Sequence, residues 1–259
     1  MPSSKLPVGI RILLLDIETS PLLAWVWGIW QQNVAINQIA ESGTVLCWAA
    51  KWLDGDEVQF GSVQKGKPLQ MLGKIHKLLD QADVVIHFNG TKFDIPTLNR
   101  EFLLHGFLPP SPYKQVDLLK TARQNFKFPS NKLEYLLKAL KIGEKVKTGG
   151  FDLWLGCMKK DPKCWEKMKE YNVADVVEME KLYKKLLPWV KGHPNVAMYQ
   201  ADKEVCPHCG HDKFQQRGWY RANTYQYRKY SCSNTACGKW FRGAKSEGGR
   251  QTIYTGAMG

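Results

Sequence analysis

Four carboxylates and one tyrosine in this 259-residue chain have the types and spacing of a cation-binding catalytic site. They lie in three separate segments: Asp16 and Glu18 in LLLDIETSP, Asp94 in HFNGTKFD, and Tyr171 and Asp175 in EYNVADVV. Acidic side chains gathered from distant segments are well suited to hold divalent metal ions against a phosphate. This pattern therefore predicts a metal-dependent nuclease.

Local secondary structure would aim these side chains in pairs. An apolar run before Asp16 predicts a buried strand, on which residues two apart, such as Asp16 and Glu18, point to the same face. Tyr171 and Asp175 are four residues apart in a helical pattern and would share one helix face. Asp94 follows another apolar strand and is predicted as the N-cap of a helix.

Each acid also has a plainer interpretation. Asp16 could be a solvated strand end, Asp94 only a helix cap, and Asp175 one more charge on a helix rich in Glu and Lys. The neighbours of Asp16 and Asp175 are largely apolar, however. A carboxylate in apolar surroundings is costly unless a cation compensates it, which favours metal ligands.

The three segments, in this order and spacing, resemble the three exonuclease motifs of the DEDD (DnaQ-like) superfamily, which has a ribonuclease H-like fold. Tyr171, four residues before Asp175, is similar to the tyrosine of the DEDDy branch, to which the proofreading domains of family A and B DNA polymerases belong. The resemblance covers roughly residues 10–190. It implies 3′-to-5′ release of nucleoside monophosphates.

The resemblance also implies a role for each matched residue, with two Mg²⁺ or Mn²⁺ ions as cofactors. Asp16 would bridge both ions, Glu18 and Asp175 would complete the site that binds the attacking water, and Asp94 would support the second ion. Tyr171 would orient the water, because a phenol with a pKa near 10 is a poor general base at neutral pH.

Residues outside these motifs have open interpretations. Asn89 could contact the substrate strand or only shape its turn, and Lys147 could reach a phosphate or stay idle in an exposed loop. Five tryptophans could include a base-stacking platform, although strand alternation favours core packing for most of them. They are Trp25, Trp27, Trp30, Trp48 and Trp52.

Four cysteines near the C-terminus predict a structural zinc site. Cys206 and Cys209 have the tight spacing of a zinc knuckle, and Cys232 and Cys237 could complete a tetrahedral set. The segment resembles zinc ribbons of nucleic-acid-processing proteins. Its second pair, Cys232 and Cys237, is separated by four residues instead of the usual two. His208 and His211 are therefore possible substitute ligands, less favoured than the cysteines.

The stretch RGWYRANTYQYRKY between the cysteine pairs alternates aromatic and basic residues, as a hairpin would. One face could pack while the other meets nucleic acid, or the module could bind a protein partner. The net charge of +13 lies almost entirely after residue 110, which fits a basic surface for a polyanion, although lysine-rich helices can equally be solvated faces. The expected partner is nucleic acid, DNA more than RNA.

We therefore expect an α/β fold, with a ribonuclease H-like mixed sheet flanked by helices and a small C-terminal zinc-ribbon β module. The expected domains are residues 1–198 for the nuclease, 199–243 for the ribbon and 244–259 for a disordered tail. No secretory or membrane-spanning segment is evident, which predicts a soluble, intracellular, cytoplasmic protein suited to phage or bacterial DNA metabolism.

The leading hypothesis is a metal-dependent 3′-to-5′ exonuclease that acts on single-stranded DNA ends, with a zinc ribbon that assists binding. A ribonuclease or a structure-specific endonuclease of the same fold is the nearest alternative. A non-catalytic adaptor that binds nucleic acid is the alternative from another class, and the retention of all four acids with the tyrosine argues against it.

Overall fold

The computed structural model describes residues 9–200, 204–222 and 225–247. It contains two compact units, a larger one of residues 11–183 and a smaller one formed mainly by residues after Tyr183. Within the described residues, no helix is long and apolar enough to cross a membrane.

The centre of the larger unit is a mixed five-stranded sheet with the order β5-β4-β1-β6-β7. Strand β4 runs antiparallel to both β1 and β5, whereas β6 is parallel to both β1 and β7. This arrangement confirms the expected α/β class. The strands are β1 (Ile12–Thr19), β4 (Val45–Trp52), β5 (Val58–Ser62), β6 (Val84–His87) and β7 (Lys114–Asp117).

Six α-helices and three short 3₁₀ segments complete the architecture of the described residues. The sequence pattern did not predict α5, which is a single short apolar stretch, or β7, whose sequence KQVD lacks an apolar run. The helices are α1 (Pro68–Asp80), α2 (Asp94–Leu104), α3 (Leu118–Asn125), α4 (Leu133–Ala139), α5 (Phe151–Met158) and α6 (Pro162–Leu186). The 3₁₀ segments are η1 (Ile36–Gln38), η2 (Leu187–Trp189) and η3 (Val196–Tyr199).

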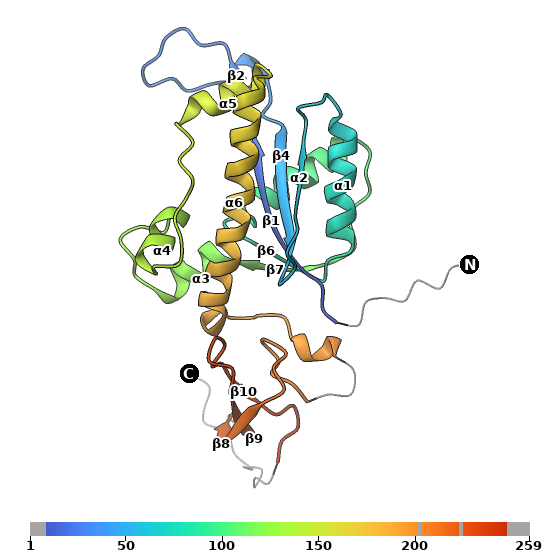
Figure 1. Ribbon diagram of the computed structural model, residues 1–259, viewed down its shortest axis with the longest axis vertical. Helices are drawn as coiled ribbons and strands as arrows, with labels where there is room; N and C mark the ends of the chain where they lie inside the picture. The colour runs from blue at the N-terminus through green and yellow to red at the C-terminus, as the bar shows by residue number, and fades with distance from the viewer. Residues whose placement is uncertain (1–8, 201–203, 223–224, 248–259) are drawn as a thin grey trace, which may run out of the picture. The chain divides into compact units, whose positions relative to one another are not determined.

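Strand alternation decides which helices cover each face of the sheet (Figure 1). Leu13, Leu15 and Ile17 of β1 pack in one core with the apolar residues of α1 and α2. A second core joins β4 to α5 and α6. The even-numbered residues of β1, which include Asp16 and Glu18, point to the face opposite α1 and α2.

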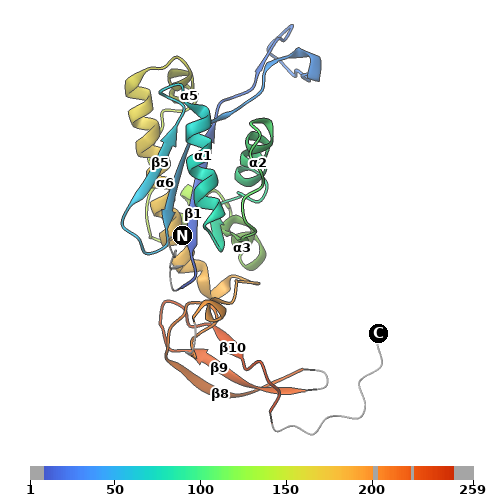
Figure 2. The same cartoon turned by 90° about the vertical axis from the view of Figure 1, so that its right-hand side faces the viewer.

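Residues 20–44, here called the arm, leave the sheet between β1 and β4 (Figure 2). The arm contains only a short two-stranded ladder of β2 (Leu23–Ala24) and β3 (Ile39–Glu41). The apolar run of residues 24–30 does not continue as a strand beyond Ala24. The expectation of core packing for most of the five tryptophans is therefore wrong. Of these, Trp48 is buried and Trp52 partly buried, while the three arm tryptophans are exposed.

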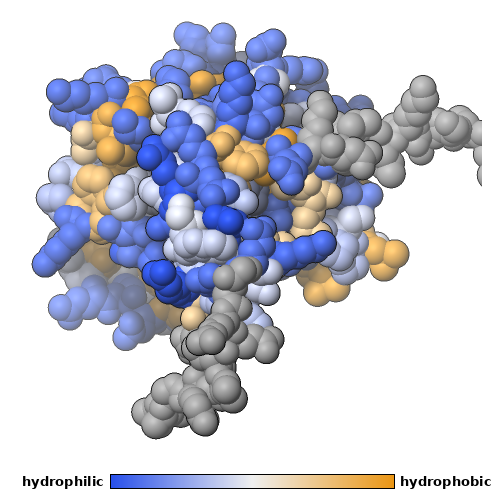
Figure 3. Space-filling model, turned by 90° about the horizontal axis from the view of Figure 1, so that it is seen from below, coloured by the Kyte–Doolittle hydropathy of each residue, from blue (hydrophilic) through white to orange (hydrophobic). Residues whose placement is uncertain are grey.

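The smaller unit contains an antiparallel sheet with the order β10-β9-β8. Its strands are β8 (Phe214–Arg221), β9 (Gln226–Cys232) and β10 (Trp240–Arg242). The backbone N–H of Val196 donates to the carbonyl of Pro207 over 2.8 Å, which joins η3 to the cysteine region. Hydrophilic residues predominate on the face of the molecule shown in Figure 3, where apolar residues form small scattered groups.

The domain limits predicted at residues 198 and 243 remain predictions. The compact units divide between Tyr183 and Lys184, inside the last turn of α6. The expected disordered tail lies outside the described residues from position 248 onward. Its first residues are described, and Glu247 pairs there with Arg228 over 3.1 Å.

Candidate active site

Strand β1 and helix α6 bring together three of the predicted carboxylates. Single carboxylate oxygens of Asp16, Glu18 and Asp175 all lie within 4.8 Å of one another. Asp16 and Glu18 share one face of β1, and α6 covers that face with Asp175 directed toward it. The structure thus joins two acidic segments that are more than 150 residues apart in the sequence.

Asp94 lies in the same cleft but enters it differently from the sequence prediction. It is the first residue of α2 and does not act as the N-cap, a position that Phe93 occupies without a side-chain bond. The Asp94 Oδ1 instead accepts a hydrogen bond of 3.1 Å from the backbone N–H of Ile17, the residue between Asp16 and Glu18. This bond holds the start of α2 against β1, so the N-cap prediction was wrong although the residue reaches the site.

Tyr171 is buried one helical turn before Asp175, and its ring contacts Trp154 at a centroid distance of 6.0 Å. Burial raises the pKa of the Tyr171 phenol far above its usual value, and the neighbouring carboxylates Asp175 and Glu18 raise it further. The hydroxyl therefore stays protonated at neutral pH, which excludes it as a general base and leaves it able to donate a hydrogen bond.

Two side chains that the sequence analysis did not identify support the acids. The Asn172 side-chain amide donates to Asp16 Oδ2 over 2.7 Å and is completely buried. Trp154 of α5 hydrogen-bonds to the Glu18 side chain. The three-residue spacing between Asn172 and Asp175 could have indicated a shared helix face. No signal pointed to Trp154, because its helix was not predicted.

A lysine that the sequence analysis did not identify, Lys145, reaches the acidic cluster. The Lys145 Nζ lies 2.9 Å from Asp175 Oδ2 and 4.7 Å from the centre of the Tyr171 ring. Lys147 is exposed in the same loop and does not line the cleft. The loop has no regular secondary structure, so its sequence could not tell which of the two alternating lysines points inward.

Asn89 lines the cleft and also shapes the turn that precedes α2. Its φ of 69° lies in the left-handed region that asparagine tolerates. The backbone N–H of Asn89 donates to Asp117 Oδ1 over 3.1 Å, and its carbonyl accepts from the N–H groups of Lys92 and Phe93. Both interpretations of Asn89 therefore stay open.

The four acids and Tyr171 line a cleft of about 650 Å³. Its walls carry three basic side chains, Arg123, Lys132 and Lys145, together with the aromatic rings of Phe88 and Phe93. Cationic side chains beside aromatic rings suit the phosphates and bases of a polynucleotide. The cleft is therefore acidic at its base and has basic and aromatic groups on its walls.

Burial and mutual repulsion disfavour the ionised carboxylates. Burial raises the pKa of Glu18 and of Asp94 to about 7, and Asp175 adds to the shift at Glu18. The pKa of Asp16 is raised well above its usual value by burial and then by Asp94, Glu18 and Asp175. Burial also raises the pKa of Asp175, which Lys145 partly opposes. One ammonium group does not balance four carboxylates.

The side chains at this site fit divalent cations. Asp175 Oδ1 is buried and has no hydrogen-bond partner, which is unfavourable unless a cation or water binds it. The ligand atoms are all carboxylate oxygens, the donors that Mg²⁺ and Mn²⁺ prefer. The cluster around Asp16 can therefore bind hard divalent cations.

The cysteine cluster fits a different cation. The Sγ atoms of Cys206, Cys209, Cys232 and Cys237 all lie within 4.8 Å of one another. The pairs Cys206–Cys237 and Cys209–Cys232 are 4.0 and 3.6 Å apart, close to the ~3.8 Å edge of a tetrahedron with Zn–S bonds of ~2.3 Å. This geometry is compatible with a zinc ion held by four thiolates, and the wider gap in the second pair does not prevent it.

The raised pKa values predict a pH-dependent effect of Glu18→Gln on the stability of the protein without added Mg²⁺ or Mn²⁺. Folded Glu18 retains its proton up to about pH 7, whereas the unfolded side chain loses it near its ordinary value of 4.5. The native protein therefore loses stability as the pH rises between these values, and the uncharged variant avoids that loss. The melting temperature of the variant should exceed that of the native chain by a margin that grows from pH 5 to pH 8. Over this range the difference in the free energy of unfolding should grow by on the order of 2 kcal/mol.

Thermal unfolding followed by circular dichroism measures this margin, with the exposed Glu57→Gln as the matched control. A margin that stays constant across the pH range would contradict the buried, repelling state of Glu18.

One family of known proteins matches most of the larger unit. The RNase H superfamily matches residues 13–187. A family B DNA polymerase from the hyperthermophilic archaeon Pyrobaculum calidifontis is similar in structure, with 17% sequence identity and a TM-score of 0.49. That similarity covers 69% of this chain and 25% of the polymerase chain, and the curated proteins contain no match. Because the superfamily match spans more than half of its residues, the chain belongs to the RNase H superfamily.

Proposed function

We propose that this chain is a metal-dependent 3′-to-5′ exonuclease of the DEDDy type that hydrolyses DNA from single-stranded ends. Superfamily membership supports nuclease activity in general. The observation that carries the finer proposal is the convergence of Asp16, Glu18 and Asp175 in one cleft with Asp94 and Tyr171. The acids also occur in the order that the DEDDy resemblance requires.

Two Mg²⁺ or Mn²⁺ ions would be held by Asp16, Glu18, Asp94 and Asp175, and would supply an activated water and stabilisation of the leaving oxygen. The chain's own residues would position these ligands. Asn172 fixes Asp16 through its amide, and the Ile17 N–H fixes Asp94. Preorganised ligands lose less entropy when the cations bind, which strengthens the site.

The protonated Tyr171 hydroxyl would donate a hydrogen bond that orients the attacking water beside Asp175. Lys145 would be displaced from its pairing with Asp175 when cations enter, because their positive charge would repel its ammonium group. Its ammonium group could then contact a phosphate of the strand. Arg123 and Lys132 on the cleft walls would neutralise further phosphates.

The surface of the smaller unit supports a role in nucleic-acid binding. One face of its sheet packs inward through Phe214, Tyr230 and Phe241, whose ring centroids are 5.3 to 5.5 Å apart. The other face presents Arg242 at 3.8 Å from the Tyr227 ring. Lys229 lies on the same face, 5.0 Å from the exposed Trp240. Bases can stack on such rings while the cations meet phosphates.

The nuclease proposal predicts that Asp16→Asn and Asp175→Asn each slow metal-dependent hydrolysis by roughly 10³-fold or more, since each removes a charged cation ligand. The test incubates 5′-labelled single-stranded DNA, the same sequence as RNA, and a circular single strand with Mg²⁺ or Mn²⁺. The native chain should shorten linear DNA stepwise from its 3′ end and leave the circle intact.

The exposed Glu57→Gln serves as the control and should retain native rates. Cleavage of the circle would contradict an exonuclease, and degradation of RNA with DNA spared would identify the ribonuclease alternative. Native activity in the Asp16→Asn variant would refute the assigned site.

The ribbon proposal predicts that replacing both Cys206 and Cys209 by Ser removes the bound zinc and weakens DNA binding more than it slows cleavage at saturating DNA. The reason is that two thiolates cannot hold the small sheet together, whereas the acidic cleft belongs to the larger unit. Elemental analysis should find about one zinc per native chain and almost none in the variant.

Cys164→Ser is the matched control, because Cys164 lies outside the cluster and should leave the zinc content unchanged. Zinc-free protein that binds DNA with full affinity would exclude this role for the ribbon.

A further inference from the structure

The arm is chemically unlike the rest of the chain. It contains no charged residue between Glu18 and Glu41, although 24% of the chain is charged. Its apolar side chains are nevertheless exposed. Trp25, Trp27 and Trp30 are 75%, 99% and 81% exposed. Contiguous apolar surface of this kind marks an interaction site in soluble proteins.

The arm has its own hydrogen bonds and does not depend on a partner for its course. At its base, the Ser20 N–H donates to the Thr44 carbonyl over 2.8 Å, and the Thr44 N–H donates to Ser20 Oγ over 2.9 Å. Farther out, the Trp25 N–H donates to the Gln38 carbonyl over 2.9 Å, and the Gln38 side-chain amide donates back to the Trp25 carbonyl over 3.0 Å. Trp25 thus lies on a bonded frame, and the tip that carries Trp27 and Trp30 extends from it, where the Gln32 side-chain amide donates to the Trp30 carbonyl over 2.7 Å.

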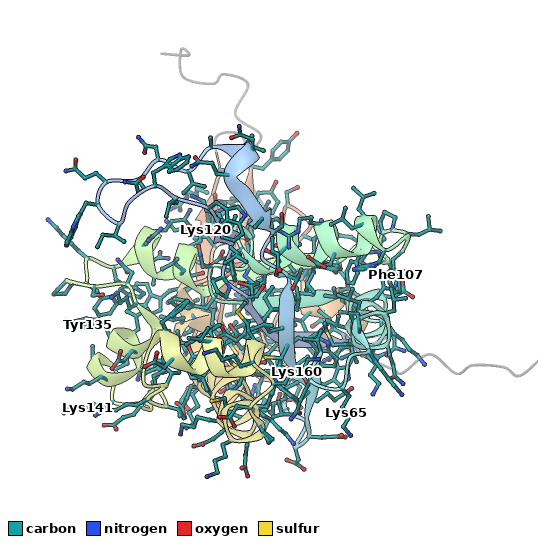
Figure 4. The ribbon with its side chains drawn as sticks, turned by 90° about the horizontal axis from the view of Figure 1, so that it is seen from above. Lys65, Phe107, Lys120, Tyr135, Lys141 and Lys160 are labelled. Atoms are coloured by element: carbon teal, nitrogen blue, oxygen red, sulfur yellow. The ribbon has the colours of Figure 1, made fainter. Side chains whose placement is uncertain are left out.

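The arm also has a direct connection to the catalytic cleft. It continues from the end of β1 that carries Asp16 and Glu18, so its base lies next to the acidic cluster. From there it projects beyond the end of the sheet, on the side of the larger unit where α3 and α4 lie lower down (Figure 1). In the view from above, the arm lies on the opposite side from Phe107 (Figure 4). Residues of α3 and of the segment leading into α4 line the cleft.

We propose that Trp25, Trp27 and Trp30 stack on unpaired bases of the polynucleotide strand whose end occupies the cleft. This inference rests on the proposed nuclease function. It adds that the part of the substrate outside the cleft is an unpaired strand, which the arm binds. Indole rings stack on any base, because every base has a π face, and this contact needs no charge.

The composition of the arm favours bases over other occupants. The tip carries Gln31, Gln32 and Asn33, whose amides can hydrogen-bond to base edges. A membrane-binding arm would combine its tryptophans with lysines or arginines for anionic headgroups, and the arm has neither. The phosphates of the same strand would contact the basic side chains of the cleft, Arg123, Lys132 and Lys145.

The test measures binding of a labelled oligothymidylate and of an abasic strand of the same length to the whole 259-residue chain with Asp16→Asn, a change that slows hydrolysis. Replacing both Trp27 and Trp30 by Ala should weaken oligothymidylate binding by roughly tenfold or more, since each lost stacking contact contributes about 1–3 kcal/mol. Binding of the abasic strand should not change. The slope of log affinity against log salt should also stay the same, because no phosphate contact is lost.

Matched variants separate stacking from simple apolar contact. Trp27→Phe keeps an aromatic face and should keep most of the affinity, whereas Trp27→Leu keeps only the apolar character and should lose it. Leu108→Ala removes an equally exposed apolar side chain elsewhere and should have no effect. Because these side chains project into solvent, melting temperatures should remain within about 1 °C of the parent protein.

Unchanged affinity of the double variant for oligothymidylate would overturn the proposal, and so would an equal loss for the abasic strand. If the double variant instead abolishes self-association or binding to anionic lipid vesicles while oligothymidylate binding stays intact, the arm serves that other partner and the proposal is wrong. The nuclease function fails separately, if the native chain does not hydrolyse DNA although the stacking pattern is observed.

Discussion

The crowding of buried carboxylates around Asp16 is the constraint on which the rest of the active site depends. Four acids share one cleft with a single lysine in contact, and burial raises the pKa values of all four. Such a cluster costs stability in the folded protein unless cations neutralise it. Bound cations would offset the repulsion between these carboxylates. The electrostatics of the cleft are thereby connected with its proposed chemistry.

The fold supplies the rigidity that this arrangement needs. Strand β1 is central in the sheet, and α6 packs across the face that carries Asp16 and Glu18. A buried ion pair between Lys51 of β4 and Glu180 ties α6 to the sheet one helical turn beyond Asp175. Repulsion between the acids therefore acts against two packed cores and is not relieved by a simple displacement of either element.

The sequence predicted the parts of the site that depend on local periodicity. Two-residue spacing on β1 and four-residue spacing on α6 correctly paired Asp16 with Glu18 and Tyr171 with Asp175. The sequence also predicted that the acids of three distant segments converge on one site, but not the individual contacts that support them. Three such contacts depend on tertiary packing: the bond from the Ile17 N–H to Asp94, the support of Asp16 by Asn172, and the pairing of Lys145 with Asp175.

In the arm, the sequence pattern led to a wrong prediction of burial. The continuous apolar and aromatic run AWVWGIW has the composition of a buried segment, yet its three tryptophans are exposed. Periodicity indicates which side chains share a face, but it does not indicate what that face meets. In this chain the face is available to a ligand, and its lack of charge restricts the chemistry of that ligand.

The central claim is that Asp16, Glu18, Asp94 and Asp175 hold a pair of divalent cations at the end of a polynucleotide strand. The most direct measurement is anomalous diffraction from crystals grown with Mn²⁺ and a short DNA strand carrying a hydrolysis-resistant phosphorothioate at its 3′ end. The account predicts two manganese peaks roughly 3.5–4 Å apart that share Asp16 as a ligand, with Lys145 no longer paired with Asp175. Crystals that contain the strand but show no manganese between Asp16, Glu18 and Asp175 would contradict it.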